Sequence, residues 1–397
     1  MANNLQKSFG AYPTATQISS TRHFVQTPSG VLYVIFVDAN SDLAFSKSTN
    51  FGASWSTPTV IFTGTVTGYA VWYDRWSNIS AGLIHLAYTD SGIDDTLYRT
   101  IDTENSDTLS TETTVFVGAS TANGGHLSIT RAVGGNVYCK TVLDAGAEGG
   151  FFRLPNANVP SGAWDAARTV DEVIATMDQM ILQPDFDAAD TQDILAIFWD
   201  SSADEISRKL YDDSANSWSE TSISTGMVDT ALANIGQHFA AAPDIANTRT
   251  VLIAWNGIDT ANADLNCWTV DSGTITAKTD VVTNSTDDQG FAALSIDTET
   301  GYWYAFYGGK SDGSETYNTS VNIYMKVSTD SGSTWGSETL VSSALFSARH
   351  IFGCPRLLFS APGNIPPVAL TQTGGTGETI IYYPRPSRKL THILYGG

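Results

Sequence analysis

Short hydrophobic runs separated by turn residues recur along the whole chain. Apolar and polar residues alternate, or aromatic residues cluster, and Gly, Asn, Asp and Ser bound each run. No stretch keeps the 3.6-residue period of a capped helix. The pattern therefore predicts an all-β protein. The most hydrophobic run of each unit covers residues 31–38, 83–90, 137–144, 194–200, 251–256, 302–307 and 367–372.

These runs start about 51–65 residues apart, a spacing typical of propeller blades. Each follows a shorter strand and precedes a third strand, and most units add a fourth. Four antiparallel strands repeated seven times predict a single seven-bladed β-propeller over residues 1–397, which closes on itself and leaves few free sheet edges. A six-bladed ring is the alternative. Residues 1–20 are expected to close the ring beside the last blade, with 390–394 as the rival segment.

Two octapeptides share one turn pattern. Residues 328–335 read Ser-Thr-Asp-Ser-Gly-Ser-Thr-Trp, and residues 48–55 read Ser-Thr-Asn-Phe-Gly-Ala-Ser-Trp. In this pattern the acid or amide accepts hydrogen bonds from its own backbone, the glycine supplies a positive φ, and we expect the tryptophan to be buried under the turn. The residues that carry the pattern are Ser48, Asn50, Gly52, Trp55, Ser328, Asp330, Gly332 and Trp335.

This spacing resembles the Asp-box, or BNR repeat, of the sialidase-like β-propeller superfamily. The resemblance implies a turn between the third and fourth strands of a blade, and it marks the fold rather than a catalytic centre. Sialidases are expected to carry an arginine triad and a tyrosine nucleophile paired with a glutamate. Here Arg22 is followed by His23 and Phe24 in place of Arg-Ile-Pro, and no Tyr/Glu pair matches. We therefore expect a non-catalytic member with no catalytic residues. A sialidase-like hydrolase or a polysaccharide lyase is the alternative.

Polar residues gather where the first strand of each unit is expected to start. Antiparallel order puts these starts on the same face as the second-strand ends, opposite the octapeptide turns. Arginine and histidine there suit an anionic ligand at the mouth of the central channel. The other interpretation is that these positions carry polar residues only because the mouth of the channel is exposed to solvent. The candidate ring consists of Arg22, His23, Arg75 (with Asp74 before it), His126, Gln179, His238, Arg349 and His350.

Two further sets lie near this expected face. Second strands end in Asp38, Asp90, Asp144 and Asp200, which we interpret mainly as turn-forming residues. Four aromatic residues at the second unit could stack on sugar rings or could belong to the core. They are Tyr69, Trp72, Tyr73 and Trp76.

The amino-acid composition limits the classes of partner that this protein is expected to bind. The 397-residue chain carries 20 Lys and Arg against 41 Asp and Glu, a net charge of −21, which argues against nucleic acid and anionic membranes. Three widely spaced cysteines, Cys139, Cys267 and Cys354, predict buried apolar positions rather than a disulfide framework. We expect no cofactor and no metal.

The start of the sequence and the class of fold suggest a location. The opening residues lack the apolar core of a signal peptide, and no run is long enough to insert into a membrane. The expectation is synthesis in the cytoplasm and a place in a phage or other virion, as a tail or surface protein. There the propeller would bind a host glycan or other virion proteins, and could be oligomeric within that assembly.

Overall fold

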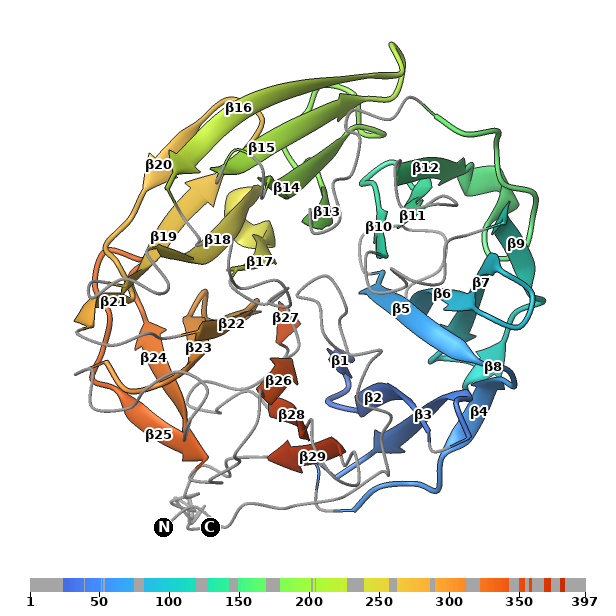
Figure 1. Ribbon diagram of the computed structural model, residues 1–397, viewed down its shortest axis with the longest axis horizontal. Helices are drawn as coiled ribbons and strands as arrows, with labels where there is room; N and C mark the ends of the chain where they lie inside the picture. The colour runs from blue at the N-terminus through green and yellow to red at the C-terminus, as the bar shows by residue number, and fades with distance from the viewer. Residues whose placement is uncertain are drawn as a thin grey trace, which may run out of the picture.

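A computed structural model shows a ring of β-sheets whose shortest axis runs through the centre (Figure 1). The structure describes residues 24–38, 40–50, 52, 54–74, 82–118, 127–142, 149–168, 179–200, 203, 205–226, 239–256, 263–285, 290–311, 322–342, 350–353, 357–358, 368–372 and 379–382. Residues 1–20 and 390–394, the two candidates for closing the ring, lie outside this set.

The sheets follow one another along the chain and around the ring. The first is β1 (Phe24–Gln26), β2 (Leu32–Val37), β3 (Leu43–Ser48) and β4 (Thr59–Phe62). The second is β5 (Val66–Tyr73), β6 (Leu83–Asp90), β7 (Asp95–Asp102), β8 (Thr108–Leu109) and β9 (Thr113–Val117). The third is β10 (Ser128–Arg131), β11 (Val137–Val142) and β12 (Gly149–Leu154), and the 3-10 helix η2 (Asn156–Asn158) follows it.

The chain continues around the ring in the same way. The fourth sheet is β13 (Gln179–Pro184), β14 (Ile194–Asp200), β15 (Glu205–Asp212) and β16 (Ser217–Thr225). The fifth is β17 (Phe239–Asp244), β18 (Arg249–Asn256), β19 (Ala263–Val270), β20 (Ile275–Ala277) and β21 (Val282–Ser285), with the 3-10 helix η3 (Ile245–Asn247) after β17. The sixth is β22 (Gly290–Asp297), β23 (Trp303–Gly308), β24 (Ile323–Ser328) and β25 (Thr339–Ser342). A smaller sheet of β26 (His350–Gly353), β28 (Val368–Gln372) and β29 (Thr379–Tyr382) comes last, and β27 (Leu357–Leu358) pairs in parallel with β22.

The prediction of seven four-stranded blades is wrong. The β-propeller has six blades, from β1–β4 to β22–β25, as the alternative had it, and the smaller sheet of β26, β28 and β29 that follows has three strands among the described residues. Within the described residues only β1–β4 and β13–β16 are plain four-stranded sheets. The outer strand is split in two where β8 and β9 both pair with β7, and where β20 and β21 both pair with β19. The outermost strand of a sheet pairs with only one other strand, so an interruption there disturbs less of the sheet than one in a central strand.

The core consists of layers between consecutive sheets. The central strand β18 illustrates the arrangement, because its side chains alternate between two layers. Val251, Ile253 and Trp255 pack toward the sixth sheet, while Leu252 and Ala254 pack toward the fourth. Equivalent clusters join the first sheet to the second, the second to the third, and the third to the fourth. Because each second strand is buried on both faces, it is a nearly continuous apolar run, which is why these strands were recognisable in the sequence.

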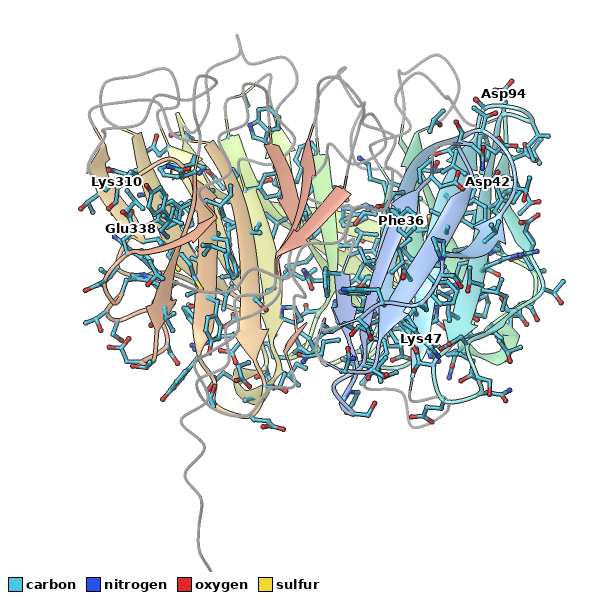
Figure 2. All side chains as sticks on the ribbon, turned by 90° about the horizontal axis from the view of Figure 1, so that it is seen from below. Phe36, Asp42, Lys47, Asp94, Lys310 and Glu338 are labelled. Carbon is cyan, nitrogen blue, oxygen red and sulfur yellow. The ribbon has the colours of Figure 1, made fainter. Side chains whose placement is uncertain are left out.

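The octapeptide turns lie where the sequence placed them within a blade. The segment 48–55 joins β3 to β4, and 328–335 joins β24 to β25. Asn50 Oδ1 accepts from Ser54 N at 2.8 Å, and Asp330 Oδ1 accepts from Thr334 N at 2.9 Å. We call the face of the disc that carries these turns the turn face. In Figure 2, Lys47 lies toward this face, whereas Asp42 and Asp94, in turns after second strands, lie at the opposite one.

The two tryptophans of these turns are less buried than expected. Both Trp55 and Trp335 are half-buried rather than covered by their turns. Trp55 meets Phe24 edge to face, with ring centroids 6.1 Å apart. Trp335 Nε1 donates to the carbonyl of Thr279 in the fifth sheet at 2.8 Å. Trp55 therefore packs on the first strand of its own sheet, whereas Trp335 contacts the preceding sheet, and both indoles stay partly exposed.

The aromatic group at the second unit belongs to the core. Tyr69 and Trp72 are 0% and 2% exposed within the layers on either side of β5, so stacking on a sugar is wrong for both. Tyr73 is half-buried, and Trp76 lies outside the described residues. Cys139 and Cys267 are buried free thiols, as predicted, while Cys354 also lies outside the description.

Strand-end aspartates form turns as interpreted. Asp38 Oδ1 accepts from Asn40 N at 2.8 Å, and Asp90 Oδ1 accepts from Gly92 N at 3.1 Å. Asp144 lies outside the described residues, and so does the side chain of Asp200. In the described chain, no helix is long and apolar enough to cross a membrane.

Gly332 offers a test of the turn geometry. It has φ +80°, and an added Cβ would lie 2.5 Å from Cζ3 of the buried Trp303. Gly301 has φ +72° with no neighbour within 4 Å of such a Cβ. We expect Gly332→Ala to lower the free energy of unfolding by about 1–3 kcal/mol more than Gly301→Ala, because both add backbone strain but only the first overpacks the core. Urea denaturation of both variants measures the difference, and equal losses would contradict the close packing of this turn on Trp303.

Candidate functional site

A cavity of about 380 Å³ lies on the turn face of the fourth sheet. Its lining comes from the loop between β13 and β14, from the β15–β16 hairpin, and from Ser272 in the β19–β20 turn of the next sheet. The first two segments meet because antiparallel strand order brings the first-to-second loop and the third-to-fourth turn to one face. The size suits a small ligand or one unit of a larger one.

Aromatic side chains form one wall of this cavity. Tyr211 on β15 and Trp218 on β16 are cross-strand partners, with ring centroids 5.0 Å apart. Tyr211 is 1% exposed, and its ring also meets Phe151 of the third sheet at 4.9 Å. Trp218 is half-buried. Tyr211 is therefore fixed by packing, while Trp218 offers apolar surface to the cavity.

Two carboxyl groups of the β13–β14 loop interact directly and have opposite protonation tendencies. Burial, together with the hydrogen bond to Asp187 and the charge of Asp187, raises the pKa of Asp185 to about 7. Partial burial would raise the pKa of Asp187, but hydrogen bonds from Ser272 Oγ at 2.6 Å and Ser272 N at 3.1 Å outweigh it and lower the pKa. Near neutral pH the pair therefore shares one proton, held mainly by Asp185.

Asp185 is the most buried carboxyl group of the cavity lining. It is 4% exposed, and its Oδ1 has no hydrogen-bond partner among the described residues. A buried acceptor left in this way is destabilising unless a bound group satisfies it. Its position in the lining makes it the clearest indication of a ligand in the described chain.

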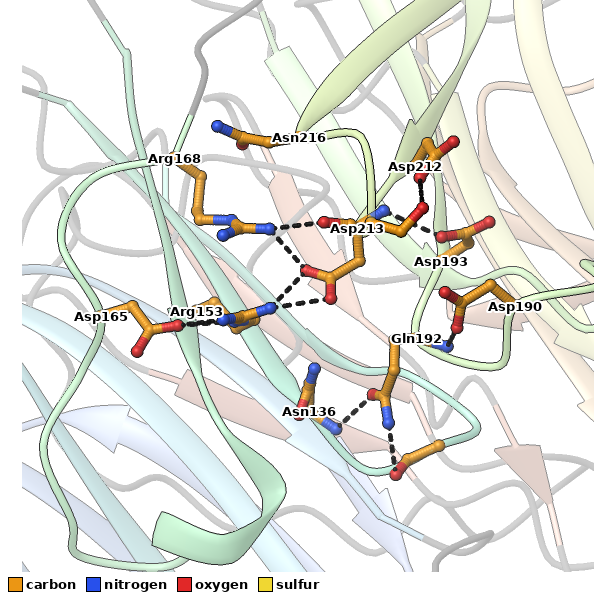
Figure 3. Close-up of polar contacts among 12 residues, drawn as sticks. Asn136, Arg153, Asp165, Arg168, Asp190, Gln192, Asp193, Asp212, Asp213 and Asn216 are labelled. Carbon is orange, nitrogen blue, oxygen red and sulfur yellow. Dashed lines mark hydrogen bonds and ion pairs between the residues drawn. The ribbon is translucent and has the colours of Figure 1, made fainter.

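A charged cluster centred on Asp213 lies next to the aromatic wall and includes Arg153, Arg168 and Asp165 (Figure 3). Asp213 accepts from Arg153 Nη1 at 2.8 Å and from Arg168 Nη2 at 2.9 Å, which ties the third sheet to the β15–β16 turn. Arg168 Nε also donates to the Tyr211 hydroxyl at 2.7 Å. On the other side of Arg153, Asp165 accepts from Nε at 2.6 Å. Both arginines are thus engaged, and neither lines the cavity.

The remaining carboxylates are held by the loop and the turn. Asp193 Oδ1 accepts from Asp213 N at 2.9 Å, and its pKa is raised by burial although this hydrogen bond opposes the shift. Asp212 Oδ1 accepts from Ser214 Oγ and Ala215 N, both at 2.7 Å, and these hydrogen bonds lower its pKa. Unlike Asp185, these two carboxylates therefore already have donors.

The cavity suits recognition better than acid and base catalysis. An aromatic surface next to carboxylates and serine hydroxyls can stack on a sugar ring and accept hydrogen bonds from its donors. The two carboxyls of a glycosidase stand roughly 5–9.5 Å apart, across the scissile bond. Asp185 and Asp187 hydrogen-bond directly, so this pair is too close for that arrangement. The described residues contain no group of three or more His, Cys, Asp or Glu suited to a metal ion.

The predicted ring lies almost entirely outside the description. This holds for Arg22, His23, Arg75, His126, His238 and Arg349. Gln179 and His350 begin the inner strands β13 and β26, but their side chains are not described. One related placement is wrong: Asp74 follows the end of β5 instead of heading a first strand, and it is buried against Arg131 and His85. β5 covers Val66–Tyr73, so Asp74 lies after the end of a first strand and therefore toward the turn face.

The cavity was not predicted from the sequence. No candidate residue named from the sequence falls in the β13–β14 loop or the β15–β16 turn. One signal was present, since that loop places four aspartates within nine residues, namely Asp185, Asp187, Asp190 and Asp193. Their closeness to Trp218 and Ser272 depends on sheet packing, which no local pattern reveals.

Comparison with known proteins finds solved structures with a similar fold. No family model and no curated protein matches the chain. Among solved structures, an ulvan lyase described as a new family of polysaccharide lyase aligns over 96% of both chains, with a TM-score of 0.56 and 9% identity. A Hadza microbial sialidase aligns over 96% of this chain and 68% of its own (TM-score 0.47, 11% identity). A lectin from Aleuria aurantia in complex with Fucα1-6GlcNAc aligns over 82% and 97% (TM-score 0.43, 11% identity). The chain is a β-propeller by its ring of sheets, and the ulvan lyase shares this overall fold.

Replacing Asp213 tests whether the charged cluster holds the cavity wall. We expect Asp213→Ala to lower the free energy of unfolding by about 1–3 kcal/mol, because two partly buried arginines lose their shared acceptor. Asp212→Asn is the matched control, since it changes the neighbouring exposed carboxylate and keeps an oxygen for the turn. Urea denaturation should show a much smaller change for the control, and similar losses would mean that the cluster contributes little.

The shifted pKa of Asp185 predicts a pH-dependent stability. The folded protein holds this proton up to about pH 7, whereas the ordinary pKa is 3.8. Stability from this group is therefore greatest below the ordinary value, falls as pH rises between the two, and is level above pH 7. Asp185→Asn has no carboxyl group to titrate, so it escapes this loss. We therefore expect the free energy of unfolding of the variant minus that of the wild type to increase by about 2–4 kcal/mol from acidic to neutral pH. Urea titrations across that range measure it, and parallel curves would contradict the shift.

Proposed function

We propose that this protein is a carbohydrate-binding β-propeller whose cavity between Asp185 and Trp218 receives an uncharged or amine-bearing saccharide. The observation that carries the proposal is the buried Asp185, whose Oδ1 lacks a partner within the described chain, in a cavity that also presents a half-buried tryptophan. Sugar hydroxyls supply the donors that this carboxyl lacks, and the apolar face of a sugar ring suits the indole.

The charges around the cavity argue against an acidic sugar at this site. Asp185, Asp193 and Asp212 line it, and no Lys or Arg does so in the described part of the chain. The two nearest arginines of the charged cluster are engaged by Asp213. A uronate or sulfate would meet three carboxyl groups in a protein of net charge −21.

A glycan-active enzyme is the second candidate. The fold similarity to an ulvan lyase, at a TM-score of 0.56, supports it at the level of architecture. The direct hydrogen bond between Asp185 and Asp187 favours binding over hydrolysis within the cavity. The anion-binding ring and the virion location stay predictions of the sequence.

Removing the indole tests the proposal. We expect Trp218→Ala to weaken binding of neutral glycans, identified on a glycan array, by about tenfold or more because the stacking surface is lost. Isothermal titration calorimetry measures the affinity. Trp55→Ala is the matched control, because it removes a half-buried tryptophan that follows a third strand in another blade.

Two results would overturn the proposal. One is an array on which only sulfated or uronate glycans bind, with affinity unchanged in Trp218→Ala. The other is efficient cleavage of such a polysaccharide, followed by the ultraviolet absorbance of an unsaturated product, which would favour the lyase.

A further inference from the structure

We infer that the cavity selects saccharides bearing a positively charged amine over their uncharged counterparts, with Asp185 as the residue that receives the ammonium group. This inference rests on the proposed function and specifies its ligand class.

The hydrogen-bonding state of the carboxyl groups is the first argument. Asp187 accepts from Ser272, Asp193 from Asp213 N, and Asp212 from the turn that follows it. Only Asp185, among the carboxyl groups in and beside the cavity in the described chain, has a buried oxygen without a donor. An ammonium group supplies three donors from one atom, so it can satisfy this oxygen and still reach a second acceptor.

The distribution of charge is the second argument. The groups facing Asp185 are Asp187 and Asp193 from its own loop, Asp212 and Tyr211 from β15, and Ser272 from the neighbouring turn. None of these groups is cationic. Arg208 lies behind the lining and donates to the carbonyls of Asp271 and Ser272 at 2.7 and 3.1 Å. Arg153 and Arg168 bind Asp213 on the other side of the tyrosine. The ring of Trp218 can add a cation–π contact at the cavity wall. The described lining therefore offers negative charge and hydrogen-bond acceptors but no cation, so a cationic ligand is electrostatically complementary to it.

Proton linkage gives the inference a distinctive signature. Burial and the neighbouring Asp187 keep Asp185 largely protonated below about pH 7. A bound cation favours the ionised carboxylate, so binding near neutral pH should release a proton. For a ligand of fixed positive charge, affinity should therefore rise from pH 6 to pH 8. A neutral sugar should show no such dependence from this group.

A matched pair of ligands tests the selection. A glucosamine hexasaccharide and its fully N-acetylated counterpart differ in charge on the same backbone, and calorimetry at pH 6.5 measures both affinities. We expect at least tenfold tighter binding of the amine form, with a proton released that is detectable by comparing buffers of different ionisation enthalpy. A simple primary alkylamine, which keeps its charge and its three N–H donors from pH 6 to pH 8 as a lysine side chain does, serves as the competitor for the pH series.

Two substitutions separate a specific site from general attraction to an acidic protein. Asp185→Asn should remove the preference for the amine form, the proton release and the pH dependence, while binding of the N-acetylated form remains. Asp94→Asn, which removes an exposed carboxylate at the opposite face, should change none of these (Figure 2). Asp193→Asn is a second variant, expected to reduce the preference partly, for use if Asp185→Asn does not fold.

The outcomes are distinguishable. Equal or tighter binding of the N-acetylated form would overturn the inference and leave the proposed function standing. Absence of binding by both forms and by every neutral glycan would overturn both. A preference that persists in Asp185→Asn and disappears with added salt would show non-specific attraction to the net charge, and would also overturn the inference.

Discussion

Face-to-face packing of consecutive sheets is the interaction on which the rest of this structure depends. Each layer combines apolar side chains from two sheets, so a sheet cannot bury both faces unless it has a neighbour on each side. Burial of this apolar surface is the main stabilising contribution, and closure of the ring lets every blade receive it. The outer edges contribute least, which is where strands are split.

Polar contacts then fix neighbouring sheets to each other at the turn face. Asp107 in the β7–β8 turn accepts from Tyr33 of the first sheet at 2.6 Å and also binds Lys47. Asp213 joins the fourth sheet to the third, and Asp187 joins it to the fifth. Because such contacts form between turns, the spaces beside them are shaped by two sheets at once. The cavity next to Asp185 is one of these spaces, so its ligand site depends on the ring as well as on its own blade.

This origin explains the chemistry of the cavity. Turns are rich in aspartate because its side chain accepts backbone N–H groups, and several turns meeting at one face concentrate negative charge. Most of these carboxylates are satisfied by their own loops. Asp185 differs because the loop buries it beside Asp187, and this arrangement links sugar recognition to protonation in our proposal.

The sequence by itself determined the all-β class, the second strands and the two octapeptide turns, because these features depend on contacts within a few residues. Leu83–Asp90 and Ile194–Asp200 were predicted with the bounds that the structure gives them, since a strand buried on both faces is a continuous apolar run. The tertiary structure alone decided the number of strands in each blade, since the outer edge has weak patterning. It also placed Asp74 in the core and brought Asp185 beside Trp218 and Ser272. Those outcomes depend on how one sheet packs against the next, and no local pattern of residues encodes that packing.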